Sequence, residues 1–207
     1  MLTIKQQVLV PVAAFAAQGN IDHLKVALNE GLDQGLTINE IKEVLVQTYA
    51  YAGFPRSLNA LSAFMEVLKA RKLAGKNDEI GREASPLASG KSMLEVGTEN
   101  QTKLVGQPVK GPLFDFAPAI DLFLKSHLFG DIFARDNLDF ETREVATIAM
   151  LAALSGTQSQ LKSHYQMCMN TGLEKSDLYE IVAILEKKVG PQIGKQARQT
   201  LDEFLKG

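Results

Sequence analysis

The sequence predicts an all-α fold built from two related helical repeats. Apolar residues recur at helical spacing along most of the chain, alternating strand patterns are nearly absent, and the second half of the sequence repeats the first. A hydrophobic fraction of 45%, a charged fraction of 22% and a formal net charge of -2 are typical of a globular protein. A chain of 207 residues is long enough to bury a sizeable core.

The first third of the chain contains the clearest helix signals. A helix over 21–34 is expected to end at Gly35, because glycine suits the left-handed turn that closes many helices. Thr37 and Glu40 have capping-box spacing, and the apolar positions that follow predict a helix that stops at Gly53. Another amphipathic helix follows the next proline.

The middle of the chain has a different composition. Residues 73–106 are rich in Gly, Ser, Asn, Lys and Glu with little periodicity, which predicts a linker or an irregular segment. Beyond it, an apolar helical stretch precedes Asp139, which is expected to cap a helix, and helical patterns continue to the C-terminus. We therefore expect an N-terminal repeat over 1–72, a linker, and a C-terminal repeat over 107–207.

The repeat is visible in a direct alignment. Residues 19–69 align without a gap with residues 156–206, and glycines coincide at helix ends in both copies. Only glycine adopts the left-handed turn without strain, so this coincidence favours duplication over chance similarity between helices. With a slip of one residue the alignment extends back to the start of the chain.

The apolar run at 8–17 resembles the core of a secretory signal, but it has a counterpart inside the second copy, so we interpret it as folded sequence. No stretch reaches the roughly 18 uninterrupted apolar residues of a membrane span. We therefore predict a cytoplasmic protein without membrane contact. The balanced charge also argues against nucleic-acid binding through bulk charge.

The two copies differ where chemistry is expected. His164 aligns with Ala27, and Glu144 aligns with Gln7 or Val8, so only the C-terminal copy has a Glu/His pair. If the two helices form an antiparallel hairpin, the two side chains lie roughly 6 Å apart along the axis and within reach across it. Such a pair is suited to general acid–base catalysis. The alternative is that His164 is a core residue and Glu144 only favours a helix N-terminus.

Other chemistry is less well supported by the sequence. The single cysteine, Cys168, excludes an intramolecular disulfide and is expected to be a buried, inert thiol. Three scattered histidines give no metal-ligand spacing, and no glycine-rich phosphate loop is present. We therefore predict neither a metal nor a cofactor.

Six segments carry a recognisable family pattern: 143–149, 160–164, 170–173, 127–135, 35–41 and 49–60. They resemble the carboxymuconolactone decarboxylase family, whose members share the AhpD-like all-helical fold. The resemblance implies a fused two-copy member that assembles as a homo-oligomer, a trimer or a hexamer, with sites between repeats or subunits.

The same resemblance separates two activities. The peroxidase branch of the superfamily places two cysteines before the histidine, and counting back from His164 puts those positions at Thr157 and Gln160. A dithiol peroxidase needs both an attacking thiolate and a resolving thiol, so this chain cannot run that cycle alone. The remaining branch implies a cofactor-free carboxy-lyase of the 4-carboxymuconolactone decarboxylase type, acting on a small carboxylated lactone or related acid.

For this activity we expect His164 to donate a proton and Glu144 to orient it or relay the proton. Arg135 and Arg56 are candidate anchors for a substrate carboxylate, although most arginines form surface ion pairs. His127 is a second candidate acid or substrate contact, with simple packing at a helix end as the alternative.

Tyr49 and Tyr51 are candidates for lining the pocket from the other copy, unless they form core or subunit contacts. Two further functions stay open at this point: a thiol-dependent antioxidant accessory protein and a non-catalytic oligomeric binding protein.

Overall fold

The computed structural model describes residues 1–86 and 90–206, and within these ranges all regular structure is helical. The predicted all-α class is confirmed. The N-terminal unit comprises α1 (Ile4–Gln18), α2 (Ile21–Asp33), α3 (Ile38–Ala52) and α4 (Phe54–Leu73). The C-terminal unit comprises α8 (Phe140–Ala152), α9 (Gln158–Thr171), α10 (Lys175–Ile184), its short π-helical continuation η2 (Leu185–Val189) and α11 (Pro191–Lys206).

The two units follow the repeat in the sequence. Helices α3 and α10 begin at Ile38 and Lys175, and α4 and α11 begin at Phe54 and Pro191, which are positions that the gapless alignment pairs. The backbone of Gly19 has φ 71° and that of its counterpart Gly156 has φ 77°. A side chain at either position would strain this left-handed conformation. Gly19 caps α1 directly, whereas α8 ends at Ala152 and Gly156 lies in the turn that leads to α9.

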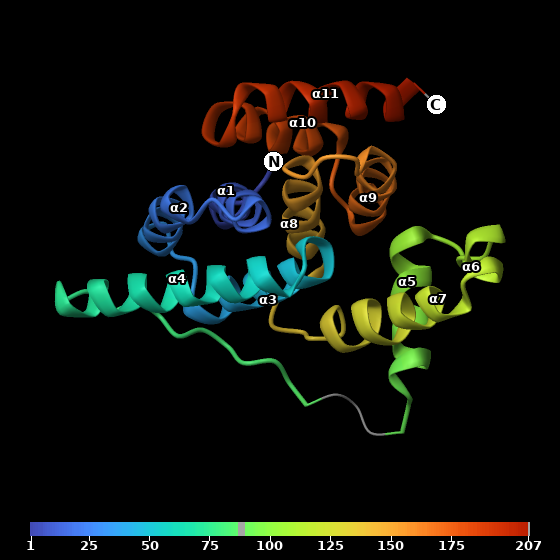
Figure 1. Ribbon diagram of the computed structural model, residues 1–207, viewed down its shortest axis with the longest axis horizontal. Helices are drawn as coiled ribbons and strands as arrows, with labels where there is room; N and C mark the ends of the chain where they lie inside the picture. Colours follow the sequence, from blue (N-terminus) through green and yellow to red (C-terminus); the bar gives the residue numbers. More distant parts are fainter. Residues whose placement is uncertain (87–89, 207) are drawn as a thin grey trace.

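The first helices of the two units form the centre of the molecule. In Figure 1, α1 and α8 lie side by side, with α3 and α4 on one side and α10 and α11 on the other. One continuous apolar cluster spans both units. Almost every residue from Val8 to Ala17 is buried, which explains why this helix is apolar around its whole circumference. In the described ranges, no helix combines the length and hydropathy required to cross a membrane.

The interval between the units is more ordered than predicted. The expected linker over 73–106 contains a helix, α5 (Met93–Val105), which starts with a Ser92/Glu95 capping box. Ahead of α5, the extended segment after α4 runs along α3, where the carbonyls of residues 79 and 80 accept hydrogen bonds from the first backbone N–H groups of that helix. The predicted domain boundaries themselves stay a prediction.

Three helical pieces follow α5: α6 (Pro112–Phe116), α7 (Pro118–Phe123) and the π-helical η1 (Leu124–Ile132). Helices α5 and η1 cross with their backbones in contact. A Cβ atom on Gly97 would lie 1.6 Å from the carbonyl oxygen of Lys125, and one on Gly130 would lie 2.6 Å from that of Met93. Only glycine fits at this crossing, so α5 and η1 form one tightly joined pair beside α9.

Candidate active site

The Glu/His pair lies between α8 and α9. The side chain of Asp139 caps α8 by accepting from the Thr142 amide at 2.8 Å, as predicted, and this start places Glu144 in the second turn. Nδ1 of His164, in the middle of α9, lies 2.6 Å from Oε2 of Glu144. Glu144 is 0% exposed and His164 is 7% exposed. The expected hairpin therefore brings the two groups into direct contact inside the protein.

His164 lines a cavity of about 720 Å³. Its walls come from α3, α9, the α5/η1 pair and the segment that leads to α6, and apolar side chains cover most of it. In the described ranges, Tyr51 and His164 are the titratable residues of the lining. The lining residues are Ala50, Tyr51, Gln101, Val105, Gln107, Val109, Phe114, Leu124, Leu128, Phe129, Leu151, Thr157, Gln160, Ser163, His164, Gln166 and Met167.

Tyr51 comes from the N-terminal unit and packs edge-on against the His164 ring, with centroids 5.8 Å apart and an interplanar angle of 79°. Its hydroxyl is buried and has no hydrogen-bond partner among the described residues, and the same holds for Oε1 of Glu144. Burial raises the pKa of Tyr51 above its ordinary value, and the nearby Glu144 carboxylate adds to this effect. The phenol therefore stays protonated at neutral pH.

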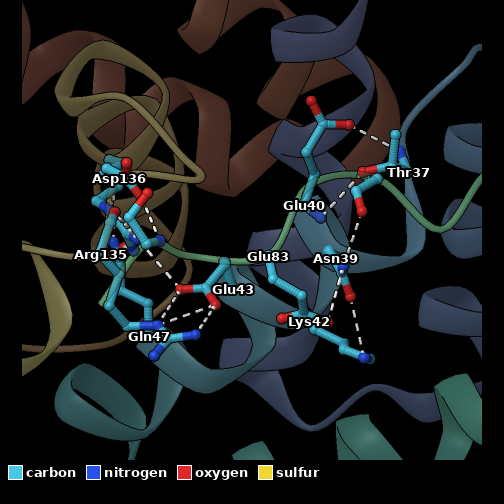
Figure 2. Close-up of polar contacts among 12 residues, drawn as sticks. Thr37, Asn39, Glu40, Lys42, Glu43, Gln47, Glu83, Arg135 and Asp136 are labelled. Carbon is cyan, nitrogen blue, oxygen red and sulfur yellow. Dashed lines mark hydrogen bonds and ion pairs between the residues drawn. The ribbon is translucent and has the colours of Figure 1, made fainter. Parts of the chain in front are cut away.

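A buried ionic network joins α8 to α3 at Arg143, the residue that precedes Glu144. Arg143 is 0% exposed, and its guanidinium lies 3.1 Å from Glu43 on α3. Arg135 binds the same carboxylate in a bidentate manner, with a shortest contact of 2.7 Å, as Figure 2 shows. Burial acts to raise the pKa of Glu43, but hydrogen bonds from the two arginines outweigh it and hold the pKa below its ordinary value.

Gln47, one turn further along α3, extends this network. Its amide donates to the Arg143 carbonyl at 3.1 Å and to the Thr147 hydroxyl at 2.9 Å. These contacts hold α8 against α3 on both sides of Glu144, so they stabilise the position from which the Glu144 carboxylate contacts His164.

The predicted carboxylate anchors lie away from this cavity. Arg135 is committed to Glu43, and Arg56 donates to the backbone carbonyl of Ala17. Within the described ranges, the lining of the cavity includes no lysine and no arginine. The physical reason is that each guanidinium satisfies an acceptor in its own neighbourhood, so the anchor role has no geometric support here.

His127 and Tyr49 also lie outside the cavity lining. His127 contacts the Tyr49 hydroxyl through Nε2, and its Nδ1 lies 2.7 Å from the Asp131 carboxylate. Tyr49 stacks on Phe54 with ring centroids 4.1 Å apart. Of the predicted site residues, the structure brings together His164, Glu144 and Tyr51.

Tyr51 and His164 are the lining residues that were predicted as site residues, and Gln101 is among those that were not. Gln101 belongs to α5, inside the interval expected to be a linker, and it is only 4% exposed. The capping-box spacing of Ser92 and Glu95 was the available signal for that helix. Gln101 thus contributes to the site from a segment outside both four-helix units.

Three further observations bear on the chemistry of the site. Cys168 is buried, and burial raises the pKa of its thiol well above the ordinary value, which agrees with the expected inert thiol. Aligning the N-caps of the two first helices, Thr3 and Asp139, pairs Glu144 with Val8 rather than with Gln7, and His164 pairs with Ala27. Val8 and Ala27 are both buried and apolar. In the described part of the chain, no group of three potential ligand side chains is placed to hold a metal ion.

The fold and the site define a duplicated all-α protein with a buried carboxylate–imidazole pair whose histidine lines a cavity. The sequence profile described as the carboxymuconolactone decarboxylase family matches residues 2–66 and 118–191. The chain belongs to the carboxymuconolactone decarboxylase family. It is 31% identical over 117 residues to a protein named 4-carboxymuconolactone decarboxylase from Acinetobacter baylyi, an alignment that covers 56% of this chain and 86% of the relative.

Proposed function

We propose that the protein is a cofactor-free carboxy-lyase that removes CO₂ from a small carboxylated lactone or related acid. The observation that carries this proposal is the 2.6 Å contact between His164 and Glu144 at the wall of a cavity of about 720 Å³. Family membership and the name of the Acinetobacter relative support the reaction class, and they favour a substrate similar to 4-carboxymuconolactone.

The proposed reaction uses the unoccupied ring nitrogen of His164. With Nδ1 directed at Glu144, Nε2 is left for the cavity. The substrate carboxylate lies against the Nε2–H of an imidazolium whose charge Glu144 balances. When the carbon–carbon bond breaks, CO₂ leaves and the electron pair passes through the conjugated system to a carbonyl oxygen. The electron pair then returns from the carbonyl oxygen to a carbon of the conjugated system, and this carbon takes the proton from Nε2 of His164. Solvent reprotonates the imidazole afterwards.

The apolar lining assists the bond cleavage. A carboxylate in this cavity is surrounded largely by apolar side chains and amides rather than by water. Its negative charge is localised before the reaction and spread over the product anion afterwards, so partial desolvation costs the reactant more than the transition state. Glu144 acts as the orienting partner, because it holds the imidazole ring in one position.

The test is the rate of decarboxylation of 4-carboxymuconolactone and related carboxylated lactones. His164→Ala should reduce kcat by roughly 100-fold or more, because the proton donor is lost. His23→Ala is the matched control, since His23 lies exposed on α2. Thermal melts should show that both variants fold. Unchanged turnover in His164→Ala would contradict the proposal.

The same samples test the other functions that the sequence left open. Peroxide turnover in the presence of a dithiol should be absent, because threonine and glutamine occupy the two cysteine positions. Tight lactone binding without any CO₂ release would instead favour a non-catalytic binding protein.

A further inference from the structure

We propose that Gln101 binds the uncharged carbonyl oxygen of the substrate, opposite the carboxylate held by His164. This inference rests on the proposed carboxy-lyase function and specifies which group of the substrate each side of the cavity recognises. It assigns a binding residue from α5, outside the two repeated units.

The first observation is that the Gln101 amide lacks a partner. The residue is 4% exposed and lines the same cavity as His164. No hydrogen bond joins its side chain to any residue in the described ranges. Its polar atoms are not among the fully inaccessible ones without a partner, so they keep access to the cavity and are available to a group that enters it.

Neighbouring amides do have protein partners. Asn100, adjacent in α5, donates to the Phe129 carbonyl at 2.8 Å. Asn170 on α9 donates to the Leu104 carbonyl at the same distance. These two side chains join α5 to η1 and to α9. Gln101 differs from them because it lines the cavity and has no structural acceptor among the described residues.

The second observation is the distribution of charge around the cavity. Among the described lining residues, His164 is the one whose side chain can carry a positive charge. A substrate carboxylate is therefore best placed at His164, where the ion pair forms. A neutral amide N–H is a weaker partner for a charge and is well suited to an uncharged carbonyl oxygen.

This placement also fits the proposed reaction. As CO₂ leaves, negative charge develops on the carbonyl oxygen, and a donor already aimed at that atom strengthens its hydrogen bond in the transition state. The Gly97–Gly130 crossing holds α5 against η1, so the donor is positioned before the substrate binds.

Calorimetric binding to two unreactive probes tests the assignment. The first probe is γ-butyrolactone-γ-carboxylate, a lactone ring that carries a carboxylate. The second probe is tetrahydrofuran-2-carboxylate, the same ring and carboxylate without the carbonyl. Gln101→Met preserves the shape and removes the donor, so it should weaken binding of the lactone probe by about tenfold or more. It should change binding of the carbonyl-free probe by less than about twofold, and the matched control Gln192→Met, at an exposed position on α11 away from the cavity, should change neither.

A second variant protects the test against misfolding. Gln101→Leu is uncharged and lacks the amide donor, so it should also weaken the lactone probe selectively, and circular dichroism should show native helix content in both variants. Equal weakening of the two probes, no weakening of the lactone probe, or no binding of either probe to the wild type would overturn the inference. Selective weakening in a protein without decarboxylase turnover would support the carbonyl contact and refute the proposed reaction.

Discussion

Glu144 uses only one of its carboxylate oxygens in a hydrogen bond. Oε2 meets His164, whereas Oε1 is buried without a partner among the described residues. An incompletely satisfied buried carboxylate destabilises the folded protein. Because the N-terminal unit has a valine at the corresponding position, the scaffold does not need this carboxylate for packing. We therefore interpret Glu144 as a residue whose presence reflects chemistry rather than stability.

Two tyrosines provide a matched test of unsatisfied groups. The Tyr51 hydroxyl is buried without a partner, whereas the Tyr165 hydroxyl donates to the Ala197 carbonyl at 3.0 Å. Tyr165→Phe should lower the free energy of unfolding by about 1 kcal/mol, and Tyr51→Phe should leave it unchanged or raise it. Urea denaturation of both variants measures the difference. A larger loss in Tyr51→Phe than in Tyr165→Phe would show that the Tyr51 hydroxyl is satisfied in solution.

The ion pairs of Glu43 with Arg135 and Arg143 join α3 to α8, and their contribution to stability depends on pH. The pKa of Glu43 lies below its ordinary value of 4.5 in the folded protein, because its hydrogen bonds to Arg135 and Arg143 outweigh burial. A carboxyl group with a lowered folded pKa stabilises the protein above its unfolded pKa and loses that contribution as the pH falls through the folded value.

Glu43→Gln tests this joint. At neutral pH the variant should lose about 3–5 kcal/mol of unfolding free energy, since Arg143 would remain buried without its counter-charge. The difference from the wild type should shrink below pH 4.5 as Glu43 itself becomes protonated. Denaturation curves over a pH series measure both effects. A difference that stays constant down to the acid-unfolding region would show that Glu43 does not titrate as described.

The elements that could be predicted from the sequence are those with local signals. The capping box at Thr37 and the cap at Asp139 marked helix starts correctly, because their hydrogen bonds are made within one turn. Helix α5 was missed because it is poor in apolar residues and gains its stability from contact with η1. That contact depends on Gly97 meeting a distant backbone, which has no local signature.

The difference between sequence signals and long-range contacts also explains which site residues could be predicted. The Glu144/His164 pair could be predicted because the two copies of one scaffold differ there, so comparison separated packing from chemistry. The arginine anchors could not be predicted, since the sequence does not show which acceptor each guanidinium meets. Arg135 forms an ion pair with Glu43, a residue 92 positions away in the chain.

At the scale of the whole molecule, exposed apolar side chains gather on α6 and α7. Phe116 is 88% exposed, and Leu113 and Phe123 are more than half exposed. Solvent-exposed apolar surface of this kind favours association. We therefore retain the prediction of a homo-oligomer, and light scattering should give the mass of a trimer or a hexamer. A monomeric mass at micromolar concentration would contradict it.

The segment between the repeats has a consequence for how this protein can change. Glu144 and His164 belong to the C-terminal repeated unit, whereas much of the cavity wall belongs to the α5/η1 pair. Substitutions in α5 and η1 can change which ligands the cavity admits and leave the Glu144/His164 contact intact. The shape of the cavity and the pair that we propose to be catalytic are thus encoded in separate stretches of the sequence, so natural variants can alter one without altering the other.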